Sequence, residues 1–367
     1  MIRILHVVYK MDRGGTESMI MNLYRHIDRS RVQFDFVEAS QGEALFDDEI
    51  TSLGGRIFRC FQYKPWKHFE YVRWWKDFFK EHARDYVAVH GHLGSTAAIY
   101  LSFAKRYGVR TIAHSHSVFT KIRLSTLFYM LYSFPTRFIA EHFFGCSRAA
   151  AISRFGTNVG NNSEKCNILN NGIDLDKFAY SEEIRLRKRK ELGFKDELII
   201  GHVGRLTYAK NHLFILEVAA ELIKQKNDVR ILLVGDGELR FSIISRSNEL
   251  GIQEKVILAG DRSDVNELLQ AMDVFVFPSI FEGLPLSLIE AQAAGLSVFA
   301  STNVPSESDV TGLCRFMELG NPQAWAEAIL ATDISRRRSY VDECRKAGYD
   351  IQDTTKWLQD YYLSLSK

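Results

Sequence analysis

Short apolar runs alternate with longer amphipathic stretches along the whole chain. Runs such as IRILHVV at 2–8, VQFDFVE at 32–38 and VRILLVG at 229–235 are rich in β-branched and aromatic residues, whereas 17–27 and 66–82 have the spacing of helices. Apolar strands joined by helices are typical of parallel sheets that are covered on both faces. The pattern therefore predicts an α/β fold built from doubly wound sheets.

This alternation stops once, at the charged stretch EEIRLRKRKELGF at 182–194, and then starts again with ELIIGHVGRL. A chain of 367 residues with 46% hydrophobic residues is long enough for two ordinary cores. We therefore expect two domains, one at 1–180 and one at 181–351. The basic residues of the charged stretch are expected on a solvated helix face.

The stretch FEGLPLSLIEAQAAG at 281–295 places one glutamate before a predicted helix and another inside it. Pro285 suits the first turn of a helix and Gly295 suits its end, so a helix is expected over about 285–294. Glu290 would then face the carboxyl edge of the sheet, where a carboxylate can accept hydrogen bonds from two vicinal hydroxyls. An ordinary solvated glutamate is the alternative.

Anion-binding groups are predicted at the same edge of the second sheet. The first amides of this helix, near Gly283 and Leu284, would point toward the carboxyl ends of the strands, where open α/β sheets bind ligands. Arg205 and Lys210 follow the strand LIIGHV, and a guanidinium and an ammonium can together neutralise a diphosphate without a metal. Each feature taken alone is also compatible with an ordinary surface.

Taken together, these segments resemble one family. GRLTYAKNH, VGDGELR, VILAGDR and FPSIFEGLPLSLIEAQAAGLSVFAS, with the earlier NNGIDLDKF, are similar in order and spacing to retaining glycosyltransferases of the GT-B fold that carry an E-x7-E motif. The resemblance implies two Rossmann-like domains facing a cleft, the second binding a nucleotide-sugar donor. It also implies that a final helix, at about 352–367, crosses back to the first domain. Trp357, Tyr361 and Leu365 recur at helical spacing and would anchor that helix.

The resemblance also assigns roles to individual residues. Arg205 and Lys210 match the diphosphate clamp and would stabilise the leaving group. Glu282 and Glu290 match the two carboxylates of the motif, so Glu290 would bind the donor ribose and Glu282 would lie beside the donor sugar as a catalytic residue. Arg262, in the segment AGDR, would lie near the nucleotide base.

The first domain carries weaker signals. MDRGGTE at 11–17 matches a glycine-rich turn of the family, where Gly14 and Gly15 would let the backbone approach the donor; a plain tight turn is the alternative. Glu38, at the end of VQFDFVE, would suit the ribose site of a Rossmann oxidoreductase. The GxGxxG fingerprint of such an enzyme is missing from both predicted sheets, however.

Nine of the eleven histidines lie in the first half of the sequence, and four of them, His90, His92, His114 and His116, stand at the ends of two predicted strands. His-x-His on a strand sends both side chains to one face, with no third ligand in view, so we expect no metal site. The resemblance implies that His116 contacts the transferred sugar as a catalytic residue and that His92 lies on the acceptor side.

Composition and charge limit the cellular setting. The five cysteines form no CxxC pair, which favours a reducing cytoplasm over a secreted disulfide framework. Residues 1–180 contain 24 Lys and Arg against 17 Asp and Glu, whereas the remainder contains 23 against 28.

Within the family, the chain looks most like bacterial enzymes of capsule and exopolysaccharide biosynthesis. That likeness implies a polyprenyl-pyrophosphate-linked acceptor and peripheral association with the cytoplasmic face of the membrane. The basic, aromatic segments 64–82 and 120–138 would meet that membrane or else pack on the sheet.

The sequence therefore predicts a retaining, metal-independent hexosyltransferase that needs no cofactor and binds no nucleic acid. Its donor would be a nucleotide sugar, most simply UDP-linked, and its acceptor a glycan or a lipid-linked saccharide. The alternatives are a non-catalytic, sugar-nucleotide-binding subunit of a glycosyltransferase complex, a Rossmann oxidoreductase, and a sugar-phosphate synthase or phosphorylase of the same fold.

Overall fold

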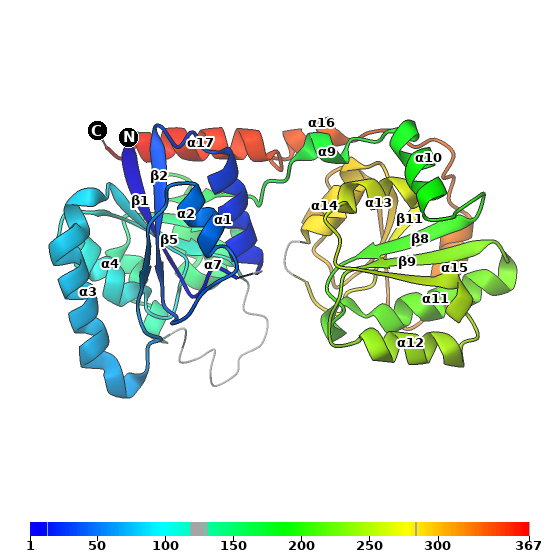
Figure 1. Ribbon diagram of the computed structural model, residues 1–367, viewed down its shortest axis with the longest axis horizontal. Coiled ribbons are helices and arrows are strands. Elements are labelled where there is room, and N and C mark those ends of the chain that lie inside the picture. Colours follow the sequence, from blue (N-terminus) through cyan, green and yellow to red (C-terminus); the bar gives the residue numbers. More distant parts are fainter. Residues whose placement is uncertain (13, 118–128, 130, 283–284, 367) are drawn as a thin grey trace. The chain divides into compact units, whose positions relative to one another are not determined.

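The chain forms two compact units, Met1–Gly172 with Ile351–Lys367 (unit 1) and Ile173–Asp350 (unit 2) (Figure 1). The computed structural model describes residues 1–12, 14–117, 129, 131–282 and 285–366. None of the described helices is long and apolar enough to span a membrane.

Unit 1 contains a parallel, seven-stranded sheet in the order β3-β2-β1-β4-β5-β6-β7. Its strands are β1 (Ile2–Val8), β2 (Val32–Glu38), β3 (Ile57–Arg59), β4 (Ala88–Gly91), β5 (Arg110–Ser115), β6 (His142–Gly145) and β7 (Cys166–Ile168). Its described helices are α1 (Gly15–His26), α2 (Asp47–Ser52), α3 (His68–His82), α4 (Ala97–Arg106), α6 (Thr136–Ile139), α7 (Arg148–Phe155), α8 (Thr157–Gly160) and α17 (Ile351–Ser364).

Helices cover both faces of this sheet. On one face α3 and α4 bury Trp75, Phe79 and Tyr100 against the strands, and on the other α1 and α17 bury Tyr24 and Tyr362. The strands are therefore apolar on both sides, which explains their continuous hydrophobic runs in the sequence.

Unit 2 contains a parallel, six-stranded sheet in the order β10-β9-β8-β11-β12-β13. Its strands are β8 (Leu198–Val203), β9 (Val229–Val234), β10 (Val256–Gly260), β11 (Val274–Phe277), β12 (Ser297–Ser301) and β13 (Cys314–Met317). Its described helices are α9 (Leu175–Phe178), α10 (Glu182–Glu191), α11 (His212–Gln225), α12 (Arg240–Glu249), α13 (Val265–Ala271), α14 (Leu286–Ala293), α15 (Pro322–Leu330) and α16 (Val341–Lys346). The expected α/β fold class, with two parallel sheets, is confirmed.

The division between the units falls at 172/173, earlier than the expected boundary at 180/181, and at 350/351. Ile173 and Leu175 are buried against Ile289 of α14 and Val341 of α16, so this segment belongs to unit 2. The two connections between the units run side by side, because Ile173 pairs with Asp350 in an isolated β-bridge.

The C-terminal helix α17 belongs to unit 1, but its buried residues differ from those expected. Leu358 and Tyr362 are fully buried, whereas Trp357 is 41% exposed. Tyr361 and Leu365 are only partly buried beside this cluster. The predicted residues Trp357 and Tyr361 contact Phe144 of unit 1, and the packed face of the helix also includes Leu358 and Tyr362.

The charged helix α10 is only partly solvated: Arg187 and Lys190 are exposed, as expected, but two other basic residues are buried. Lys188 and Arg189 are 4% and 7% exposed. Lys188 Nζ lies 2.9 Å from the carboxylates of both Asp264 and Glu267, and Arg189 pairs with Asp273 at 3.2 Å. The carboxylates of Asp264, Glu267 and Asp273, on α13 and directly beside it, neutralise Lys188 and Arg189. These two cations therefore stabilise the fold of unit 2 and are not part of a basic surface.

Candidate active site

The loops that follow β8 and β11 come together at the carboxyl edge of the unit 2 sheet. The two strands are neighbours, and Ile280 N donates to Ala209 O at 2.8 Å, so the loops run side by side. One loop carries Arg205 and Lys210, and the other carries Glu282. Residues that lie more than seventy positions apart in the sequence therefore share one edge.

Lys210 and Glu282 form a close ion pair. Nζ of Lys210 lies 2.5 Å from Oε2 of Glu282, and both side chains are only 18% exposed. Ser279 Oγ donates to the same carboxylate oxygen at 3.3 Å, and the ammonium lies 4.6 Å from the centroid of the Phe277 ring. Each charge is thus held in a fixed place by its neighbours.

Arg205 is positioned by its backbone, while its side chain is exposed. Leu206 is fully buried and its N–H donates to Asp236 O at 3.0 Å. Gly235, at φ +127°, lies so close that a Cβ there would be 2.3 Å from Gly204 O. Among the described residues no hydrogen bond or ion pair involves the Arg205 guanidinium, so its donors face solvent.

Glu290 lies on α14 and is partly buried. Burial raises the pKa of its carboxyl group to about 7. No described residue donates a hydrogen bond to this carboxylate. An unpaired acid in such a place is costly, so a ligand with hydroxyl donors would be a favourable partner.

Gly283 and Leu284 lie outside the described residues, and α14 begins at Leu286 after Pro285. Arg262 lies apart from the other predicted donor residues. It follows β10, the outer strand of the sheet, and its Nε and Nη2 both bind Asp264 at 2.7 Å.

In unit 1 the predicted glycine pair begins α1. Gly14 is the extended residue before the helix, at φ −127° and ψ 167°, so its conformation does not require glycine. A Cβ at Gly14 would lie 2.2 Å from Oε2 of Glu17, whereas one at Gly15 would meet no atom within 4 Å. Open space beside Gly15 is compatible with a ligand close to the backbone.

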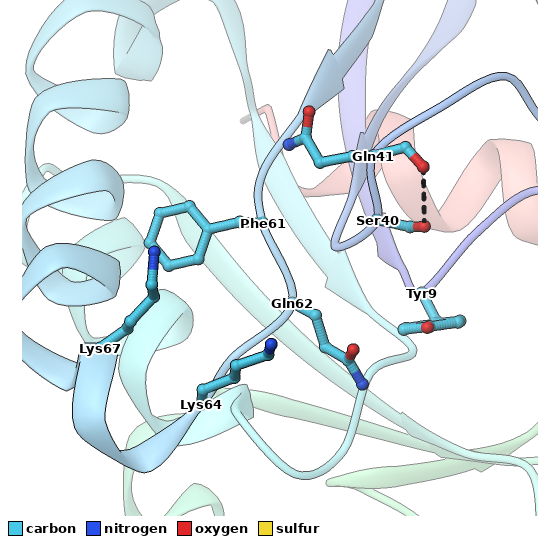
Figure 2. Close-up of a pocket in the computed structure, with 7 residues that line it drawn as sticks. All are labelled: Tyr9, Ser40, Gln41, Phe61, Gln62, Lys64 and Lys67. Atoms are coloured by element: carbon cyan, nitrogen blue, oxygen red, sulfur yellow. Dashed lines mark hydrogen bonds between the residues drawn. The ribbon is translucent and has the colours of Figure 1, made fainter.

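The loops after β1, β2 and β3 form a cavity of about 290 Å³ in unit 1. Figure 2 shows Tyr9, Gln41, Gln62, Lys64 and Lys67 around it. Its described lining holds two cations and no carboxylate, which makes it electropositive. At the same end of α3, the neighbouring side chains of Trp66 and Phe69 are 77% and 85% exposed. Later turns of the same helix pack against the sheet, which is one of the two expected arrangements.

Five histidines lie together on β1, β4 and β5 and directly after them: His6, His90, His92, His114 and His116. His6 Nδ1 lies 2.9 Å from His92 Nε2, and His92 Nδ1 lies 2.8 Å from His116 Nε2. His90 contacts Tyr362 OH at 2.6 Å and His114 at 3.1 Å. The two site histidines predicted from the sequence, His92 and His116, are thus hydrogen-bonded to each other.

These imidazoles are neutral around pH 7. Burial lowers the pKa of His6 and of His116 to about 3, and it also holds the pKa values of His90, His92 and His114 well below the usual range. The rings of His90 and His92 stack with centroids 4.5 Å apart. His92 and His116 are partly exposed, so the array reaches the carboxyl edge of the sheet.

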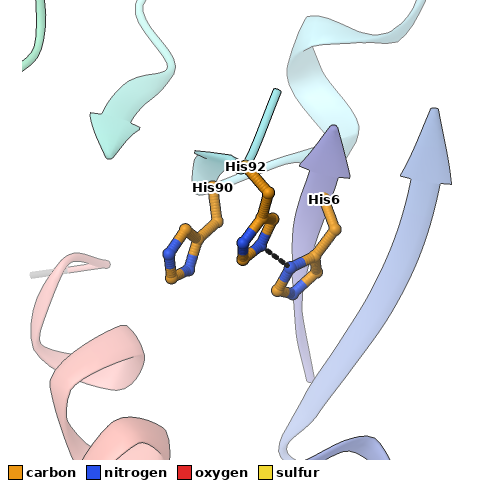
Figure 3. Close-up of side chains that lie close together, drawn as sticks. All are labelled: His6, His90 and His92. Carbon is orange, nitrogen blue, oxygen red and sulfur yellow. Dashed lines mark hydrogen bonds between the residues drawn. The ribbon is translucent and has the colours of Figure 1, made fainter. Parts of the chain in front are cut away.

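The expectation that no third ligand lies near the paired histidines was wrong. One ring nitrogen each from His6, His90 and His92 lies within 4.8 Å of the other two (Figure 3). The same holds for His92, His114 and His116. His6 was missed because it lies far away in the sequence. It is in register with His90 on the neighbouring strand, a relation that only the sheet order reveals.

The sequence has clear relatives among known proteins. The family model described as "Glycosyltransferase Family 4" matches residues 13–177, and the one described as "Glycosyl transferases group 1" matches residues 184–341. A putative glycosyltransferase, EpsF of Bacillus subtilis, is 34% identical over 98% of this chain and 96% of its own. The chain belongs to the group 1 glycosyltransferases. This glycosyltransferase is also 25% identical, over 99% of both chains, to the capsular polysaccharide biosynthesis glycosyltransferase CapH of Staphylococcus aureus.

A further relative of this glycosyltransferase is named for its substrates. The Escherichia coli UDP-Gal:alpha-D-GlcNAc-diphosphoundecaprenol alpha-1,3-galactosyltransferase is 30% identical over 55% of this chain and 54% of its own. Among solved structures, Anabaena Alr3699/HepE in complex with UDP superposes with a TM-score of 0.79, at 17% identity, over 99% of this chain and 100% of that one. The glycosyltransferase therefore has the GT-B fold.

Proposed function

We propose that this glycosyltransferase moves a sugar from a UDP-sugar to a lipid-linked or glycan acceptor in capsule or exopolysaccharide biosynthesis, with retention of the anomeric configuration. The observation that carries the proposal is the edge of unit 2 at which Arg205, Lys210 and Glu282 meet on adjacent loops, with Glu290 on the helix that follows. Arg205 and Lys210 would bind the donor diphosphate, and Glu290 the ribose hydroxyls.

Catalysis in this proposal is electrostatic. The two cations would stabilise the departing diphosphate, which would accept the proton of the acceptor hydroxyl on the same face of the sugar. Lys210 is held against Glu282 at 2.5 Å, so its ammonium is in place before the donor binds. His116 would contact the transferred sugar, and the reaction would need no metal ion.

The acceptor would bind to unit 1, where His92 and His116 reach the edge of the sheet. The name of the Escherichia coli relative supports a lipid diphosphate acceptor. Trp66 and Phe69, exposed beside Lys64 and Lys67, would meet the cytoplasmic face of the membrane, since aromatic and basic side chains favour the headgroup region.

Calorimetric titration tests the donor site. UDP is expected to bind with and without EDTA, and more tightly than GDP or NAD. Lys210→Ala and Glu290→Ala should each weaken UDP binding by about tenfold or more, because each removes a charged hydrogen-bonding group. Lys224→Ala is the control, since this lysine is 68% exposed and pairs with Glu221 on the same helix. Unchanged affinity in both site variants would contradict the assignment.

Transfer itself needs a second assay. UDP-sugars are offered with polyprenyl-diphosphate-linked saccharides, and the anomeric configuration of the product is read by NMR. A retained configuration supports the proposal, and an inverted one contradicts it. UDP binding without transfer to any acceptor would instead favour the non-catalytic subunit.

A further inference from the structure

Arg154 is a buried cation in unit 1 that lacks an acidic partner. It lies near the end of α7 and is 4% exposed. Its Nη1 donates to the backbone oxygen of His114, but its Nε and Nη2 are buried without a hydrogen-bond partner. Within the described ranges no carboxylate forms an ion pair with it. Lys188 and Arg189, which are also buried, differ from Arg154 because each forms an ion pair with a carboxylate.

The two donors without a partner, Nε–H and Nη2–H of Arg154, lie on the same edge of the guanidinium group. Arginine commonly binds oxyanions through this edge. Nε–H and Nη2–H are parallel and match the two oxygens of a carboxylate or phosphate. This chain uses that edge repeatedly: Arg25 binds Glu49 through Nε and Nη2 at 2.6 and 2.7 Å, and Arg3 binds Asp35 through the same atoms. Only in Arg154, among these three, is the edge without an anion.

The position of the guanidinium is suited to a ligand. Side chains of a helix point back toward its first turn, so Arg154 reaches the carboxyl end of β5, where it meets the His114 backbone. A Cβ on Gly94, in the loop after β4, would lie 1.7 Å from the hydroxyl oxygen of Tyr129 and 3.1 Å from Cζ of Arg154, so the backbone of this loop closely approaches the guanidinium. His116, directly after β5, is partly exposed, and the charge of Arg154 contributes to lowering its pKa.

We propose that Arg154 binds an oxyanion of the acceptor, a phosphate or a carboxylate, through Nε–H and Nη2–H at the carboxyl edge of β4 and β5, beside His116. The inference rests on the proposed function, because it assigns the anionic group to the acceptor of that reaction. It narrows the substrate class to acceptors that carry a negative charge near the reacting sugar. Arg154 is then a specificity residue, and neutral glycans are poor acceptors.

The test measures anion binding without donor or transfer. α-D-Glucose 1-phosphate, D-glucuronate and neutral D-glucose are titrated calorimetrically at constant ionic strength. The full chain carries Arg205→Leu and Lys210→Ala in all samples, so that the donor clamp of unit 2 does not bind the phosphate. Saturable binding of at least one anion, but not of glucose, is expected. The anion that binds identifies the source of the charge.

Variants of one helix isolate the contribution of Arg154. Arg154→Leu should weaken anion binding at least tenfold, and Arg154→Lys should weaken it too, because an ammonium lacks the parallel donors. Arg148→Leu, at an exposed position of α7, should leave binding unchanged. Arg154→Leu is expected to fold, since it replaces a buried cation by an apolar residue, and Arg154→Lys serves if it does not.

Two outcomes would overturn the proposal: equal affinity in the parent double variant and in both of its Arg154 derivatives, or no saturable binding of either anion. Neither outcome bears on UDP binding by unit 2, which the calorimetric titration with UDP measures separately. Failure of the acceptor site and failure of the donor site are therefore distinguishable.

Discussion

At the scale of single residues, the candidate donor site contains a carboxyl group, that of Glu290, whose burial is unfavourable unless a ligand binds to it. Glu290 has no described hydrogen-bond donor, and burial raises its pKa to about 7. Binding sites often contain groups that lower the stability of the free protein, because the ligand supplies the hydrogen-bond partner that these groups lack. Glu290 can therefore be tested through stability as well as through binding.

Glu290→Gln should stabilise unit 2 in a pH-dependent way. The folded-state pKa of about 7 lies above the ordinary 4.5, so between these values the folded protein keeps a proton that the unfolded chain releases. The free energy of unfolding contributed by this group therefore falls as pH rises from about 4.5 to 7. The substitution should raise the free energy of unfolding by about 1–3 kcal/mol at pH 8 and by little at pH 4.5.

Urea unfolding at the two pH values, followed by circular dichroism, gives this difference. Glu307→Gln, at an exposed position of the same unit, is the control. Equal effects of Glu290→Gln at both pH values would show that the carboxyl group is solvated.

The sequence pointed to those candidate donor-site residues that lie together within one loop or one helix. Arg205, Lys210, Glu282 and Glu290 all lie within short segments that can be compared by eye, and the structure brings Lys210 and Glu282 into contact. Arg154 could not be found in this way. Its environment is formed by β5 and the loop after β4, and only the folded chain shows that no carboxylate of the described residues pairs with it.

At the scale of elements, the strands of both sheets were predictable except for β13. β13 was missed because its sequence, Cys-Arg-Phe-Met at 314–317, is short and has no buried residue. It lies at the outer edge of the unit 2 sheet, where only one side pairs with another strand. The C-terminal helix was predicted, and Tyr361 and Leu365 do pack on unit 1, but the fully buried Leu358 and Tyr362 of the adjacent stripe were missed.

The contribution of α17 to unit 1 can be measured at its buried stripe. Leu358 is fully buried among residues of β2, α1 and α17, so Leu358→Ala should lower the free energy of unfolding of unit 1 by about 2–4 kcal/mol. Lys356→Ala, exposed on the same helix, should change it by less than about 0.5 kcal/mol. Guanidinium unfolding of both variants makes the comparison; similar values would mean that α17 is only loosely attached.

At the scale of the whole molecule, one unit is continuous in sequence and the other is not. Unit 2 occupies Ile173–Asp350, while unit 1 needs both the first part of the chain and α17. The apolar clusters of unit 2 draw only on residues of its own range. It therefore has the core that an independent domain requires.

A fragment of residues 173–350 is accordingly expected to fold alone and to bind UDP with the affinity of the full chain. A fragment of residues 1–172 lacks α17, which leaves apolar surface on α1 and β2 uncovered, and it should be unstable or aggregate. Circular dichroism, size-exclusion chromatography and calorimetry of both fragments provide the test. An unfolded 173–350 fragment would show that unit 2 depends on unit 1.

Because unit 1 consists of two separate parts of the sequence, its parts are synthesised at different times. A ribosome releases the strands of the unit 1 sheet first, but α17, which packs on one face of that sheet, emerges only after all of unit 2. The second-made unit can therefore finish folding before the first-made one. Throughout that interval the nascent unit 1 exposes the apolar surface around Tyr24 and Phe34 that α17 packs on in the finished fold, and exposed surface of this kind favours aggregation.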